Sequence, residues 1–145
     1  MPRPTKFRKV EFFPEECYFV PFGKENCSES CIALKIEELE AMRLKDIEGL
    51  NQEACAEKMQ ISRQTFQNII DSARKKVALA LTEGRAISIQ GGCYISKHCL
   101  YICRECGEIY EPQQENDVRC CPKCGGCSVE CERKTHCSDK WCTHK

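Results

Sequence analysis

The sequence has no long apolar run and no excess of charge of either sign. Its 22 basic and 22 acidic side chains cancel, so a uniformly basic surface for nucleic acid is excluded. No stretch approaches the ~18 apolar residues of a transmembrane helix, and no apolar run follows the basic N-terminus as it would in an export signal. We therefore expect a cytoplasmic protein with no membrane partner.

Motifs of enzyme chemistry are also missing. The 145 residues contain no paired carboxylates, nucleophile elbow or phosphate-cradling glycine loop. A Cys-x-x-Cys pair belongs to thiol oxidoreductases when it opens a helix in a βαβ context, and no such pattern surrounds Cys103 or Cys121. The sequence therefore argues against an enzyme.

Cysteine, in contrast, is abundant. The chain has 15 cysteines, an odd number, and eleven of them lie from Cys93 onward. A secreted disulfide scaffold would explain such a count only if an export signal were present. We therefore expect reduced thiols that serve as metal ligands.

The strongest metal signal pairs Cys103-Arg-Glu-Cys106-Gly with Cys121-Pro-Lys-Cys124-Gly. A Cys-x-x-Cys turn directs two sulfurs at one ion, and the glycine after it permits the tight turn. The segment resembles a zinc ribbon, which predicts that Cys103, Cys106, Cys121 and Cys124 bind a structural zinc ion. A tail this short cannot bury a sufficient core, so metal binding is expected to supply much of its folding energy.

An alternative assignment uses Cys121, Cys124, Cys127 and Cys131, which have the spacing of a bacterial iron–sulfur cluster motif. The usual proline after the last cysteine is replaced by Glu132, and this assignment leaves Cys103 and Cys106 without a role. Zinc is therefore preferred, with an iron–sulfur cluster as the alternative. Once the ribbon is assigned, a further group of candidate ligands matches no defined metal motif: Cys127, Cys131, His136, Cys137, Cys142 and His144. Cys17, Cys27 and Cys31 are expected to be incidental reduced thiols, and His98 a surface residue.

Residues 51–77 predict two helices joined by a tight turn. Asn51 and Ser62 are good N-caps, and Gln60-Ile61 supplies the turn. Cys55 in the first helix is expected to be a small core residue. At ~100° per residue the second helix has one apolar side. The apolar side comprises Phe66, Ile69, Ile70, Ala73, Val77, Ala80 and Leu81.

The opposite side of the second helix begins with guanidinium and amide groups, which can bond bidentately to base edges. Base contacts are predicted for Arg63, Gln64, Gln67 and Asn68, next to Thr65, and a phosphate contact for Ser62 at the helix N-terminus. Arg74 and Lys75 are predicted to contact the phosphate backbone. Arg3 and Lys6 in the basic arm either enter a minor groove or form a solvated tail. The alternative interpretation of this polar side is that it is the solvent-exposed side of an ordinary surface helix with no DNA contact.

Residues 50–77 resemble the helix-turn-helix of sigma-factor region four, through Leu50-Asn-Gln-Glu53 and Ile61-Ser-Arg63. The opening Met1-Pro-Arg-Pro4, the stretch 39–44 and Gly91-Gly92 resemble an uncharacterised prokaryotic family of predicted DNA-binding proteins. These resemblances imply duplex DNA as a partner, with a homodimer and RNA polymerase as further candidate partners.

The expected fold is mainly α, with a helix-turn-helix domain and a small Cys-rich, zinc-ribbon-like metal-binding segment. The expected divisions are a basic arm and extended segment over 1–33, the helical domain over 34–92 and the metal-binding tail over 93–145. A helix from about Ile36 to Ile47 is expected to bury Leu39, Met42 and Ile47, and residues 86–89 to form a short strand. A DNA-binding transcriptional regulator is the expected function, and a metal- or redox-responsive regulator is the alternative.

Overall fold

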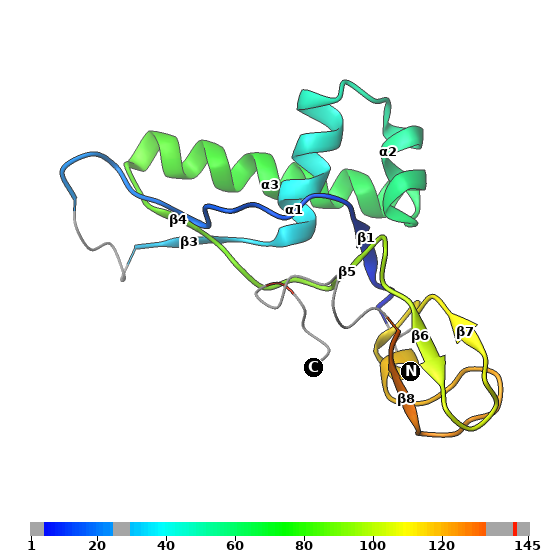
Figure 1. The fold of residues 1–145 in the computed structure, drawn as a ribbon. Helices are drawn as coiled ribbons and strands as arrows, with labels where there is room; N and C mark the ends of the chain where they lie inside the picture. Colours follow the sequence, from blue (N-terminus) through cyan, green and yellow to red (C-terminus); the bar gives the residue numbers. More distant parts are fainter. Residues whose placement is uncertain (1–4, 25–29, 133–140, 142–145) are drawn as a thin grey trace. The chain divides into compact units, whose positions relative to one another are not determined.

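A computed structural model describes residues 5–24, 30–132 and 141 (Figure 1). The chain divides into two compact units. One, here called the α/β unit, spans Arg8–Tyr94. The other, here called the cysteine-rich unit, combines Met1–Phe7 with Ile95–Lys145. The chain passes from the first to the second within strand β5 (Tyr94–Ser96).

Three α-helices form the core of the α/β unit, and α1 and α2 pack on α3 (Figure 1). They are α1 (Ile36–Met42), which continues as the π-helical turn η1 (Arg43–Ile47), α2 (Gln52–Met59) and α3 (Arg63–Glu83). Their apolar faces meet in one cluster, which removes these side chains from water and stabilises the unit. The cluster contains Ala41, Leu44, Cys55, Ala56, Met59, Phe66, Ile69 and Ile70.

Both predicted N-caps are confirmed. The Asn51 side chain accepts a hydrogen bond from the Ala54 N–H at 2.8 Å, and the Ser62 hydroxyl accepts one from the Thr65 N–H at 3.1 Å. Between the two helices Gln60 takes a left-handed conformation with φ of 55°. The tight turn expected here therefore begins at a C-cap in the αL region.

A three-stranded sheet flanks the helices. Its central strand β4 (Ile87–Ile89) pairs antiparallel with β2 (Tyr18–Phe19) and parallel with β3 (Ile32–Leu34). In this register Ile32 lies opposite Ile87 and Leu34 opposite Ile89. A further strand, β1 (Arg8–Val10), precedes them in the chain.

The prediction of a mainly α fold is wrong, because eight short strands in three small sheets accompany the helices of the described residues, and the fold is α/β. The strand expected within 86–89 forms as β4. The mixed character of the fold was missed because strands of two or three residues are too short for alternation to be recognised in the sequence. The partners β3 and β4 also lie more than 50 residues apart, so local pattern does not reveal their pairing.

Two apolar residues expected in the core are exposed instead. Ile47 is 80% exposed, whereas Leu44, one turn earlier, is 1% exposed. In η1 the Glu48 N–H donates to the Arg43 carbonyl, five residues back. This wider turn shifts the helical phase on which the prediction relied. Leu81 near the end of α3 is 77% exposed.

Three buried carboxylates of α1 are each paired. Glu37 lies 3.1 Å from the Arg8 guanidinium. Glu38 accepts hydrogen bonds from Ser72 and Lys76, both at 2.6 Å. Burial alone would raise the pKa of Glu38, but the bonds from Lys76 and Ser72 lower it below its ordinary value. These pairs tie α1 to strand β1 and to α3.

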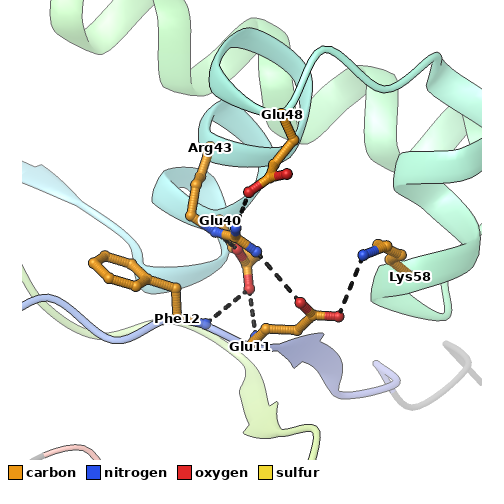
Figure 2. Close-up of polar contacts among 6 residues, drawn as sticks. All are labelled: Glu11, Phe12, Glu40, Arg43, Glu48 and Lys58. Atoms are coloured by element: carbon orange, nitrogen blue, oxygen red, sulfur yellow. Dashed lines mark hydrogen bonds and ion pairs between the residues drawn. The ribbon is translucent and has the colours of Figure 1, made fainter.

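The third carboxylate, Glu40, is 2% exposed and lies at the centre of the network in Figure 2. It accepts hydrogen bonds from the backbone N–H groups of Glu11 and Phe12 and from Arg43 Nε, the last at 2.5 Å. Arg43 also reaches Glu48 at 3.0 Å and Glu11 at 3.6 Å. The network fixes the segment after β1 on helix α1.

The cysteine-rich unit is built on a small antiparallel sheet with β6 (Tyr101–Cys103) between β7 (Ile109–Tyr110) and β8 (Val129–Cys131). A 3₁₀ turn, η2 (Glu115–Val118), lies between β7 and β8 in the chain. The end of the basic arm belongs to this unit, since the Phe7 N–H donates to the Gln113 carbonyl at 2.8 Å. No helix of the described residues is long and apolar enough to cross a membrane.

Candidate metal centre and candidate nucleic-acid interface

Two matching backbone turns carry the four predicted metal ligands. In the first, the Cys103 N–H donates to the Glu108 carbonyl and the Gly107 N–H donates to the Cys103 carbonyl, both at 2.9 Å. Gly107 has φ of 76°, in the left-handed region where a side chain would be strained. The turn holds the thiols of Cys103 and Cys106 on one side.

The second turn repeats this pattern eighteen residues later. The Cys121 N–H donates to the Gly126 carbonyl at 2.7 Å, and the Gly125 N–H donates to the Cys121 carbonyl at 2.9 Å. Gly125 has φ of 75°. The Cys-x-x-Cys-Gly motif therefore specifies the same local structure twice, and the two turns present the sulfurs of Cys103, Cys106, Cys121 and Cys124 to one another.

The four sulfurs lie within 4.8 Å of one another. Cys103 Sγ is 3.6 Å from Cys124 Sγ, and Cys106 Sγ is 3.7 Å from Cys121 Sγ. A zinc–sulfur bond of ~2.3 Å places the sulfurs of a tetrahedral site about 3.8 Å apart. The predicted convergence is confirmed, and the arrangement fits one tetrahedral metal ion.

Backbone N–H groups around the sulfurs favour thiolates, whereas neighbouring thiols oppose the ionisation of Cys124. Hydrogen bonds from the backbone N–H groups of Cys124 and Lys123 lower the pKa of Cys121 to about 7. The Gly126 N–H acts to lower the pKa of Cys124, but the neighbouring thiols of Cys103 and Cys106 raise it to about 12. Without a cation the cluster therefore retains protons, and a bound metal ion would replace them.

The alternative iron–sulfur ligands do not all converge. Among the described residues, the group of possible metal ligands that comes together contains Cys121 and Cys124 but not Cys127 or Cys131. Cys131 lies in β8 opposite Tyr101. Of the remaining candidates, Cys17 and Cys31 are half-buried and His98 is exposed. Cys27, His136, Cys137, Cys142 and His144 lie outside the described residues.

The predicted nucleic-acid contacts lie along α3 and at its N-terminus. Ser62, Arg63, Gln64 and Asn68 are exposed, and Thr65 and Gln67 are half-buried. The Gln64 amide donates to Asn68 at 3.1 Å. The opposite side of α3 is held in the core by Phe66, Ile69, Ile70 and Ala73.

The sequence did not predict a role for Gln52, the first residue of α2. Its side chain accepts a hydrogen bond from Arg63 Nε at 3.1 Å and donates one to the side-chain amide oxygen of Gln67. Gln67 also donates to Asp71 at 2.8 Å. Gln52 thus links α2 to the polar face of α3, and nothing in the local sequence indicates contacts 11 and 15 residues away.

The basic residues further along α3 differ in their partners. Arg74 contacts Asp46 at 2.5 Å, and this hydrogen bond raises the pKa of the guanidinium. Lys76 pairs with the buried Glu38. Lys75 is exposed. Lys75 therefore best fits the predicted contact with a phosphate backbone, whereas Arg74 would first have to leave Asp46.

Of the two predicted arm residues, the structure describes Lys6. Lys6 belongs to the cysteine-rich unit, where it forms an antiparallel bridge with Gln114. Arg3 lies outside the described residues. Any contact of the arm with DNA stays a prediction.

The fold and site together define a small α/β protein with a four-cysteine candidate metal centre. The chain belongs to the family described as protein of unknown function DUF134, whose profile matches residues 1–97. This confirms the expected membership of an uncharacterised family.

Similar proteins extend the match to the cysteine-rich unit. A UPF0251 protein of Clostridium botulinum (strain Loch Maree) is 66% identical over 142 residues, which cover 98% of this chain and 90% of the relative. A UPF0251 protein of Clostridium beijerinckii is 64% identical over 142 residues, covering 98% of this chain and 96% of the relative. No solved structure matches the chain.

Proposed function

We propose that this protein is a DNA-binding transcriptional regulator that places α3 in the major groove and holds a structural zinc ion in its cysteine-rich unit. The observation that carries the proposal is the exposed polar face over the first two turns of α3, formed by Arg63, Gln64 and Asn68. Guanidinium and amide groups pair with guanine and adenine edges, and the major groove, ~12 Å wide, admits a helix.

The support around α3 suits this role. Its apolar side is anchored in the core through Phe66 and Ile70, so the polar side has a fixed direction. The Gln52 side chain of α2 accepts a hydrogen bond from Arg63. This bond restricts the position of the guanidinium before DNA is bound. The partial positive charge of the helix N-terminus at Ser62 attracts a phosphate group. Lys75, about three turns further on, supplies a positive charge for a second phosphate contact.

Zinc is proposed for the metal centre because the four sulfurs have the spacing of a single tetrahedral ion. A two- or four-iron core would place several atoms among the sulfurs and hold them farther apart. A closed site of four cysteines leaves no open position for a substrate, which is typical of structural zinc. The proposed role of the metal is to hold the cysteine-rich unit folded.

The base-reading role is tested by comparing two substitutions in α3. Arg63→Ala is expected to relax the sequence preference, with a loss of ~1–3 kcal/mol confined to one base pair of the site. Lys75→Ala is expected to weaken binding to all sequences and to reduce the salt dependence of affinity. Fluorescence anisotropy with a panel of single-base-pair variants of a bound duplex, at several salt concentrations, measures both.

Arg119→Ala is the matched control, because it removes the same charge as Arg63→Ala from an exposed side chain of the cysteine-rich unit. It is expected to leave the sequence preference unchanged. Equal loss of affinity for every duplex on Arg63→Ala would contradict base reading by this face.

A further inference from the structure

Cys120 and Cys127 lie on either side of the second metal-binding turn. The two turns are offset by eighteen residues, and under this offset Cys120 and Cys127 correspond to Ile102 and Ile109. Those two isoleucines are direct cross-strand partners in the β6–β7 pair. The repeated backbone pattern therefore predicts that Cys120 lies opposite Cys127.

The hydrogen bonds support this correspondence. The Cys121 N–H donates to the Gly126 carbonyl at 2.7 Å. In an antiparallel pair, the residues next to such a hydrogen-bonded pair, here Cys120 and Cys127, form a non-hydrogen-bonded pair. Such a pair has a Cα–Cα distance of ~4.5 Å, within the ~4.4–6.8 Å that a disulfide spans. The Cys127 thiol is also close enough to Cys120 to raise the pKa of its thiol. Neither side chain belongs to the four-sulfur group.

We propose that Cys120 and Cys127 form a reversible oxidation site, a dithiol that a hydroperoxide converts to a disulfide while the neighbouring metal centre stays intact. Cys127 is exposed and Cys120 is half-buried, so Cys127 meets a dissolved oxidant first. The proposal goes beyond DNA binding and does not depend on it. It rests only on the metal centre being filled, because bound thiolates are then withheld from the oxidant.

The reaction balances with hydrogen peroxide as the oxidant. The Cys127 sulfur attacks one peroxide oxygen, the O–O bond breaks, and a sulfenic acid and one water molecule form. The Cys120 sulfur then attacks the sulfenic sulfur, the S–O bond breaks, and the disulfide and a second water molecule form. Two thiols are oxidised and one peroxide is reduced, and a dithiol reductant reverses the change.

The test uses full-length protein loaded with zinc and treated with one equivalent of hydrogen peroxide. Zinc content is measured before and after treatment, and free thiols are then alkylated in denaturant. Trypsin cleaves after Arg119 and Lys123, so the disulfide would join two peptides that separate on reduction. Fragmentation of the linked pair identifies the bonded cysteines. We expect a loss of two hydrogen masses, a Cys120–Cys127 link and unchanged zinc content.

Two variants make the assignment specific. Cys120→Ser is expected to abolish the linked peptides, whereas Cys131→Ser, which alters a thiol on β8 opposite Tyr101, is expected to retain them. Links through Cys121 or Cys124 with loss of zinc would overturn the proposal, because the metal ligands would then be the oxidised groups. Recovery of fully alkylated Cys120 and Cys127 from the treated wild-type protein would also overturn it.

Discussion

Replacing Cys106 by serine is expected to release the metal and unfold the cysteine-rich unit while the helices of the α/β unit remain folded. The sheet of the cysteine-rich unit has strands of two or three residues, which bury too little apolar surface to be stable alone. Structural zinc contributes roughly 10–16 kcal/mol in small zinc-binding peptides. Loss of one thiolate ligand should therefore remove most of this unit's stability.

Metal analysis together with amide hydrogen exchange measures this effect. Cys131→Ser is the control, because Cys131 lies outside the four-sulfur group; it is expected to keep the metal. The α/β unit has its own apolar cluster, so the helical circular dichroism signal should survive chelation. Metal retained in Cys106→Ser but lost in Cys131→Ser would support the iron–sulfur assignment instead. A collapse of the helical signal on chelation would contradict separate folding of the two units.

Replacing Glu40 by alanine is expected to destabilise the α/β unit by about 3–5 kcal/mol. The substitution leaves Arg43 without its closest carboxylate and removes the acceptor of the Glu11 and Phe12 N–H groups. Breaking one side of a buried pair is costly because the remaining groups are desolvated and unpaired. Urea unfolding followed by circular dichroism of the helices measures the change in free energy.

Glu48→Ala provides the matched control. Glu48 also pairs with Arg43, at 3.0 Å, but its side chain is 51% exposed, so its loss is expected to cost less than about 1 kcal/mol. If Glu40→Ala and Glu48→Ala lowered the free energy of unfolding equally, the Glu40 network would not be a main support of this fold.

Features encoded within a few residues were predictable from the sequence. The caps at Asn51 and Ser62 depend on a side chain reaching an N–H three residues later, and the turns that carry the four cysteines depend on the Cys-x-x-Cys-Gly spacing. The convergence of Cys103 and Cys106 with Cys121 and Cys124 followed because the two motifs match.

Features that depend on tertiary contacts were not predictable. From the local sequence a glutamate such as Glu40 would be expected at the surface. The backbone N–H groups that pair with it when buried lie nearly thirty residues away, so the sequence does not reveal them. The pairing of Arg74 with Asp46 is likewise set by the packing of α3 near η1. The cysteine spacing that suggested an iron–sulfur cluster took no account of the fold, in which Cys127 and Cys131 lie outside the four-sulfur group.

Selection from a random library of duplexes tests whether the exposed face of α3 reads DNA sequence. Zinc-loaded full-length protein is mixed with duplexes containing a randomised central segment, and bound duplexes are recovered over several rounds and sequenced. We expect enrichment of a defined motif, and loss of preference at one position of that motif with Arg63→Ala. Recovered duplexes whose sequences match the input library would contradict it.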